Sequence, residues 1–183
     1  MFSNPSMLKL ETQHLNDLVF NVYYEGKFQN LPLKNIKEQY VVFVFYPLDF
    51  TFVCPTELIE ISKRAEQFKK ANAFVLFISS DSVHSHKAWS QMSVENGGVG
   101  VLNYPMVSDK CGVLANMFGV YDKEQGQVMR ATVFYDKKYE KLRFISVNDD
   151  MIGRSTDEIL RLLGACNFVD KNGQICPCNF KAK

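Results

Sequence analysis

The sequence lacks an apolar run of membrane-spanning length, and it carries almost no net charge. Its 21 lysines and arginines offset 20 aspartates and glutamates, so the formal net charge of the 183 residues is +1. This balance gives no reason to expect nucleic acid or a membrane surface as a partner. The opening residues, MFSNPSMLKLETQHL, lack the basic start and apolar block of a secretory signal. We therefore expect a cytoplasmic protein.

Linkers and metal motifs are also missing. There is no internal repeat, low-complexity tract or Pro/Gly/Ser-rich linker, which favours one domain over residues 1–183. None of the three histidines has metal-ligand spacing with a carboxylate. Cys176 and Cys178 could be interpreted as a metal-binding pair, but two thiols without nearby histidines are a weak zinc signal. We expect no metal.

Cysteine is too scarce for a small disulfide-stapled fold, because the whole chain has five, scattered along its length. An odd number in a reducing compartment favours free thiols, some of them catalytic. We expect Cys111 and Cys166, which fall in predicted helices, to be ordinary buried small residues.

Hydrophobic patterns predict alternating strands and helices. Continuous β-branched and aromatic runs predict strands buried on both faces, at residues 40–46 and 73–79. A hairpin is expected around Glu25-Gly26. Further strands are predicted at 104–107, 130–136 and 141–147, and helices at 56–70, 84–93, 110–118 and from the capping box at 155–158 onward. The pattern predicts an α/β fold with a central mixed sheet flanked by helices.

Cys54 occupies an unusual place, between a predicted buried strand and a predicted helix. With Thr51 near the N-cap, Cys54 falls in the first helical turn, where free N–H groups and the helix dipole favour a thiolate. Pro55 is tolerated at this position. The Thr51 hydroxyl could donate to the thiolate or to a substrate oxygen. A small buried hydrophobe is the alternative for Cys54, but its position favours a reactive thiol.

A second cysteine, Cys176, lies in the polar tail that follows residue 168. Free thiols usually avoid such exposed places unless their chemistry is used. Together Cys54 and Cys176 suggest thiol–disulfide chemistry, although they are too far apart in sequence to form a C-x-x-C motif.

These residues resemble the two-cysteine peroxiredoxins, close to the alkyl hydroperoxide reductase type. The most specific match is Pro47-x-x-x-Thr51-x-x-Cys54, which resembles the peroxidatic loop of the family. Further similar segments follow in family order along nearly the whole chain: DSVHSHKAW, GGVG, YPMVSD, RATVFYD, VNDDMIGRSTDEILRLL and GQICPCNF.

The resemblance implies a thioredoxin-like fold with an N-terminal β-hairpin extension. It also implies a C-terminal arm, at about residues 168–183, that reaches a partner subunit. The implied assembly is a homodimer in which a disulfide joins Cys54 of one chain to Cys176 of the other. A ring of five dimers is common in the family.

The resemblance also implies a role for each site residue. Cys54 would attack the peroxide and become a sulfenic acid, and Cys176 would resolve it to a disulfide that a thioredoxin-type dithiol reopens. Thr51 and Arg130 would hold the peroxide. Pro47 would exclude water from the thiolate, and Glu57 would orient Arg130. No organic cofactor is required, because sulfur carries both electrons. Without the resemblance, Arg130 and Glu57 would be ordinary surface charges.

The chain departs from the family pattern in its tail. Phe180 replaces the usual tryptophan, and Cys178 adds a thiol, so either tail cysteine could resolve Cys54, with the alignment favouring Cys176. The chain ends seven residues after Cys176 without a Tyr-Phe pair, which predicts resistance to overoxidation. The alternative functions are a holdase chaperone and a general disulfide oxidoreductase, and the missing C-x-x-C argues against the second.

Overall fold

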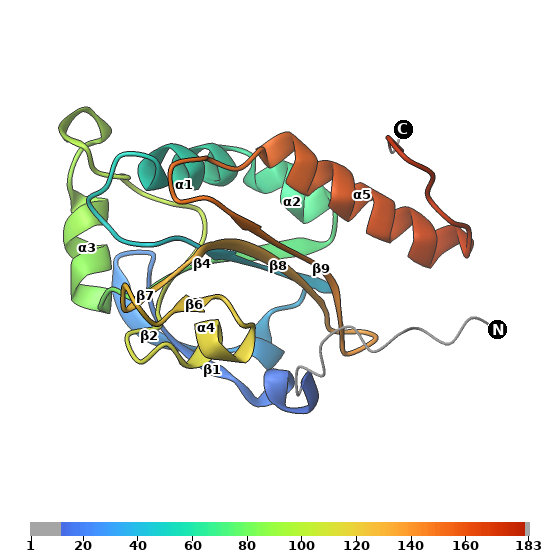
Figure 1. Ribbon diagram of the computed structural model, residues 1–183, viewed down its shortest axis with the longest axis horizontal. Helices are drawn as coiled ribbons and strands as arrows, with labels where there is room; N and C mark the ends of the chain where they lie inside the picture. Colours follow the sequence, from blue (N-terminus) through green and yellow to red (C-terminus); the bar gives the residue numbers. More distant parts are fainter. Residues whose placement is uncertain (1–11, 182–183) are drawn as a thin grey trace.

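The computed structural model describes residues 12–181, and a seven-stranded mixed sheet forms its centre (Figure 1). The strand order is β2-β1-β5-β4-β3-β8-β9. The strands are β1 (Val19–Tyr24), β2 (Lys27–Pro32), β3 (Tyr40–Phe45), β4 (Ala73–Ser79), β5 (Met106–Ser108), β8 (Arg130–Asp136) and β9 (Lys141–Asn148). A small separate hairpin consists of β6 (Tyr121–Asp122) and β7 (Gln127–Val128). The predicted α/β fold with a mixed central sheet is confirmed.

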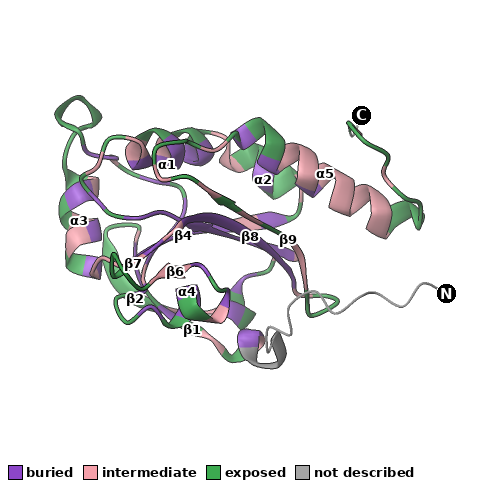
Figure 2. Cartoon of the chain, viewed as in Figure 1, coloured by how far each residue is buried: buried purple, intermediate pink, exposed green. Residues whose placement is uncertain are grey.

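Strand β3 is an interior strand of the sheet, and all of its residues are buried. It runs parallel to β4 and antiparallel to β8. Because side chains alternate along a strand, Phe43 joins the core on one face, while Val42 and Val44 join the core on the other. Figure 2 shows the buried residues gathered in these central strands. Both faces are covered, which explains why the strand has no polar positions.

Helices cover both faces of the sheet (Figure 1). One face carries α1 (Cys54–Lys63), α2 (Ala65–Lys70) and α5 (Thr156–Asn172), the other face carries α4 (Val113–Met117), and α3 (Val83–Gln91) lies at one end. The predicted helix at 56–70 is divided at Arg64. Helix α4 is shorter than predicted, because Gly112 in front of it has a positive φ of 66°. Within residues 12–181, no helix is both long enough and apolar enough to span a membrane.

Neither Cys111 nor Cys166 is fully buried, although both are predicted to be buried. Cys111 precedes α4 in a turn and is exposed, so the prediction that it is a buried helical residue is wrong. Cys166 does lie on α5, but it is only partly buried. The N-terminal hairpin is confirmed, with positive φ angles at Glu25 and Gly26. The prediction that the chain has no secretory signal concerns its opening residues, and residues 1–11 of that stretch lie outside the described residues.

Helix α5 begins as its sequence predicts and ends later than expected. The Ser155 hydroxyl accepts a hydrogen bond from the Glu158 backbone N–H, as in a capping box. The helix continues to Asn172 and stops at Gly173, which has a left-handed φ of 65°. Residues 168–172 are therefore helical, and the non-helical tail starts about one turn later than predicted.

Candidate active site

Cys54 is the first residue of α1, and only 1% of it is exposed. It therefore lies at the positive end of the helix dipole, as predicted, and Pro55 takes the next position, where an N–H has no intrahelical acceptor. The N-cap residue is Val53 rather than Thr51, and its side chain makes no capping hydrogen bond. Thr51 lies two residues before the N-cap, and Cys54 falls in the first helical turn, as predicted.

Arg130 brings positive charge to the Cys54 thiol. It is the first residue of β8, which pairs with β3, and it is 2% exposed. Its Nη1 and Nη2 atoms lie 3.6 and 3.7 Å from the Cys54 Sγ. Burial alone would lower the pKa of Arg130, but the charges of Glu57 and Cys54 outweigh it and raise that pKa. Arg130 therefore stays a cation although it is buried.

The Arg130 side chain is fixed by two further acceptors. Nη1 donates to the Glu57 Oε2 atom at 2.5 Å, and Nη2 donates to the Asp150 carbonyl at 2.8 Å. Among the side chains that the structure describes, residues 15–181, its Nε atom is the one buried nitrogen or oxygen without a hydrogen-bond partner. The guanidinium therefore faces the thiol with its two Nη atoms, and its Nε donor is left unused.

Glu57 connects Arg130 to a second buried arginine, Arg154. The Arg154 backbone N–H and Nε donate to Glu57 Oε1 at 2.7 and 2.9 Å, and Nη2 donates to Oε2 at 2.8 Å. Burial opposes the charge of Glu57, but the hydrogen bonds and charge of Arg154, with the charge of Arg130, lower its pKa. One carboxylate therefore orients two guanidinium groups, and the net charge of this cluster is positive beside Cys54.

Arg154 also ties the site to the sheet. Its Nη1 atom donates to the carbonyls of Phe45 and Ala131, at 2.9 and 2.7 Å. These residues lie at the end of β3 and the start of β8, where the loop to Cys54 leaves the sheet. The sequence alone does not single out Arg154. It lies just before α5, in a segment that resembles the family. An arginine in such a loop is ordinarily solvated, so its buried position beside Glu57 becomes apparent only in the folded structure.

The loop between β3 and α1 carries the other predicted residues. Pro47 is buried in this loop, and the Thr51 hydroxyl donates to the Leu48 carbonyl at 3.0 Å rather than to Cys54. The buried Asp49 carboxylate anchors the loop through the Tyr46 hydroxyl at 2.8 Å and the His86 Nδ1 atom at 2.9 Å.

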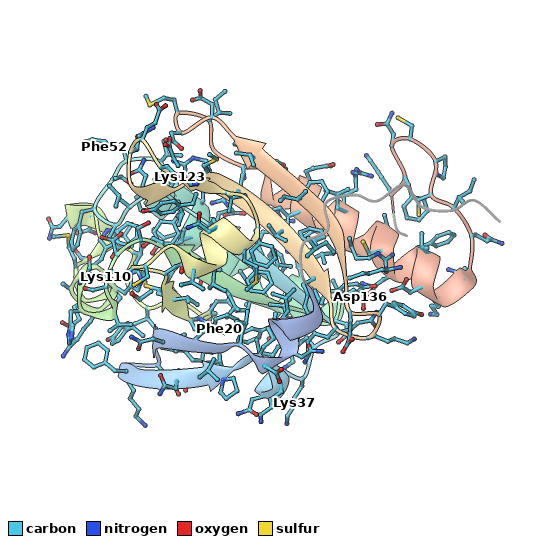
Figure 3. The ribbon with its side chains drawn as sticks, turned by 60° about the horizontal axis from the view of Figure 1, so that its bottom comes forward. Phe20, Lys37, Phe52, Lys110, Lys123 and Asp136 are labelled. Atoms are coloured by element: carbon cyan, nitrogen blue, oxygen red, sulfur yellow. The ribbon has the colours of Figure 1, made fainter. Side chains whose placement is uncertain are left out.

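The far end of the same loop carries Phe52, which is 97% exposed. Figure 3 shows Phe52 at the outer edge of the molecule. A large apolar side chain this exposed, just before Cys54, is suited to contact with another protein.

The structure does not bring Cys176 to Cys54 within one chain. Figures 1 and 3 both show the C-terminal segment at the opposite end of the molecule from the start of α1. The Cys176 Sγ atom instead lies 3.6 Å from the Ala165 carbonyl on α5. All five cysteines are free thiols. The described residues contain no group of three or more His, Cys, Asp or Glu side chains placed to hold a metal ion.

Comparison with known proteins agrees with this arrangement. A sequence model of the AhpC/TSA family matches residues 13–145. The chain is 48% identical over 157 residues to the thioredoxin peroxidase of Fasciola hepatica, covering 86% of this chain and 80% of that protein. It is 45% identical to peroxiredoxin-1 of Gallus gallus, covering 86% and 78%.

A solved structure is similar as well. The reduced 2-Cys peroxiredoxin of Plasmodium vivax superposes with a TM-score of 0.85 and 33% identity, covering 90% of this chain and 85% of that one. The predicted resemblance and the thioredoxin-like fold are therefore confirmed. With a family match over most of its length and these relatives, the chain belongs to the AhpC/TSA family of peroxiredoxins.

Proposed function

We propose that this protein is a thiol-dependent peroxidase that reduces hydrogen peroxide and small organic hydroperoxides. One observation carries the proposal: the Cys54 thiol is buried at the start of α1, with both Nη atoms of Arg130 within 3.7 Å. The Cys54 thiolate attacks the terminal peroxide oxygen, the O–O bond breaks, and the leaving oxygen takes a proton to become water or an alcohol. Cys54 is left as a sulfenic acid.

The surrounding residues assist this step. Arg130, whose Nη atoms face the sulfur, stabilises the negative charge that develops on the leaving oxygen. Glu57 holds Arg130 in place at 2.5 Å. Thr51 holds the peroxide by turning its hydroxyl from Leu48 toward the substrate, and the buried Pro47 keeps water away from the thiolate.

In the second step, Cys176 of another chain attacks the Cys54 sulfenic sulfur, and water leaves as the disulfide forms. The C-terminal segment lies at the opposite end of the molecule from the start of α1, which supports a bond between chains (Figure 1). The two Cα atoms of a disulfide must approach within about 7 Å. Cys54 is buried, so the first turn of α1 must unfold locally for this bond to form. The tail must also detach locally, because Cys176 is held against the Ala165 carbonyl on α5.

The assembly is proposed to be a homodimer, with five dimers closing a ring. Strand β9 supports a dimer, because it is an edge strand of the sheet with exposed Ile145 and Val147. An open apolar edge of this kind pairs readily with a second copy. The physiological reductant is proposed to be a thioredoxin-type dithiol, and the location cytoplasmic. The extent of the single domain, residues 1–183, remains a prediction.

The test is peroxide consumption with thioredoxin and its reductase, for the wild type, Cys54→Ser and Cys176→Ser. Wild type is expected to turn over, and both variants to lose turnover. In a single burst without reductant, Cys176→Ser should still consume peroxide, whereas Cys54→Ser should not. Full activity of Cys54→Ser would overturn the proposal.

A further inference from the structure

The tail presents a second thiol, Cys178, for which the proposed cycle has no use. Residues 177–180 form a turn, in which the Phe180 N–H donates to the Pro177 carbonyl at 3.2 Å and Asn179 has a left-handed φ of 59°. Cys178 occupies an exposed position in this turn. The chain therefore displays a thiol two residues after Cys176, on a defined turn.

Contacts with α5 hold this turn on both sides. The Phe180 ring packs on Phe168 with 4.7 Å between ring centroids, and the Phe180 carbonyl accepts from Arg161 Nη1 at 3.1 Å. On the other side, Cys176 contacts the Ala165 carbonyl. The segment between these anchors is short, so Cys176 and Cys178 remain close to each other.

Arg161 lies near both thiols. The pKa of Arg161 is raised chiefly by its hydrogen bond to Glu158, and the charges of Cys178 and Cys176 add to this effect. Arg161 thus joins α5 to the tail segment that carries both thiols.

We propose that Cys176 and Cys178 form a redox-active dithiol, and that Cys178 releases Cys54 from its disulfide. This inference rests on the proposed peroxidase function. The Cys178 thiolate attacks the Cys176 sulfur, the Cys54–Cys176 bond breaks, and Cys54 leaves as a thiolate. One disulfide is exchanged for another within the tail, so no oxidant or reductant is consumed, and the proton lost by Cys178 passes to solvent.

The site of Cys54 favours this exchange. The leaving thiolate returns to the start of α1 beside Arg130, and a well-stabilised thiolate is a good leaving group. One residue separates the attacking and attacked sulfurs, so little chain entropy is lost in bringing them together. The new disulfide is exposed in a short loop, and exposed or strained disulfides are the easily reduced ones. The external dithiol would therefore reduce Cys176–Cys178 rather than the bond to Cys54.

Peroxide titration without any reductant tests the proposal. Reduced wild type, Cys178→Ser and the matched control Cys111→Ser, which removes another exposed thiol, are treated with hydrogen peroxide and blocked with N-ethylmaleimide. Exchange frees Cys54 to react again, so the wild type and the control should consume about twice as much peroxide per chain as Cys178→Ser. Dimedone labelling distinguishes the second sulfenic acid from overoxidation.

Mass spectrometry of tryptic peptides identifies the bonds. Peptide 172–181 contains both tail cysteines, and it should carry an internal disulfide in the wild type and the control. Cys178→Ser should instead retain Cys54 cross-linked to Cys176 on non-reducing gels.

A persistent Cys54–Cys176 bond in the wild type, or a Cys54–Cys178 bond, would overturn the exchange while leaving the peroxidase intact. A wild type that consumes no peroxide would overturn both proposals. Circular dichroism checks that Cys178→Ser is folded.

Discussion

Replacement of Arg154 by methionine should destabilise this protein strongly although Arg154 does not contact Cys54. Methionine keeps much of the side-chain length and removes five hydrogen bonds: two to Glu57, two to backbone carbonyls and one to Thr132. Glu57 would keep Arg130 and the Arg154 backbone N–H, but it would lose its bidentate partner. The carbonyls of Phe45 and Ala131 would lose their donor.

The expected loss follows from burial. The Arg154 and Glu57 side chains are 4% and 3% exposed, so water cannot replace the lost bonds. Removing one partner of a buried ion pair costs about 3–5 kcal/mol. This is a large part of the roughly 5–15 kcal/mol that stabilises a typical domain. We expect Arg154→Met to lower the free energy of unfolding by about 3–5 kcal/mol.

Arg64 offers a matched control. It pairs with Asp157 at 2.6 Å, a shorter distance than in the buried pair, but the Asp157 side chain is 85% exposed. An exposed pair contributes about 0–1 kcal/mol, so Arg64→Met should be nearly neutral.

The assay is equilibrium urea unfolding of reduced protein, with all variants at one protein concentration because assembly contributes to stability. Comparison of the two variants shows whether the burial of an ion pair, or the distance between its charged atoms, determines its contribution to the free energy of unfolding. If Arg154→Met and Arg64→Met lose the same free energy, the argument from burial fails. Peroxide consumption by the Arg154→Met protein that remains folded should also fall, because Glu57 then holds Arg130 less rigidly.

Three further predictions concern the site and its supporting loops. Burial would raise the pKa of Glu57, but the two arginines outweigh burial and lower this pKa below its ordinary 4.5. The ionised carboxylate therefore stabilises the fold at pH values above 4.5. This stability is lost as the pH falls through the lowered pKa. Urea midpoints from about pH 6 to about pH 3 should fall less steeply for Glu57→Gln than for wild type, and equal slopes would contradict this assignment. Thr51→Val should slow peroxide reduction about 10²-fold with little loss of stability, whereas Thr51→Ser should restore the rate. Gly98→Ala would place a Cβ 2.1 Å from the Met92 carbonyl oxygen and should cost on the order of 1–3 kcal/mol in urea, whereas Gly153→Ala, with its nearest atom at 3.5 Å, should be nearly neutral.

Local patterns predicted much of the fold. The apolar run at 73–79 coincides with β4, and the run at 40–46 coincides with β3 to within one residue, because a strand covered on both faces is apolar along its length. The strand predicted at 130–136 is β8. Glu25-Gly26 forms the expected hairpin turn, and Ser155 caps α5. These features depend on neighbouring residues alone, which is why periodicity and turn chemistry identify them. Helix ends were less predictable, as α4 and α5 show, since single glycines with positive φ set them.

The sequence by itself also determined that Cys54 begins a helix, and the family motif named its expected partners. Only the tertiary structure decided that Glu57 is shared by Arg130 and Arg154, which follow it by 73 and 97 residues. It likewise decided that Cys111 is exposed and that the tail with Cys176 and Cys178 docks on α5. Periodicity reports which face of an element is apolar. A buried charge is stable only where distant segments bring it partners, and that requires the complete fold.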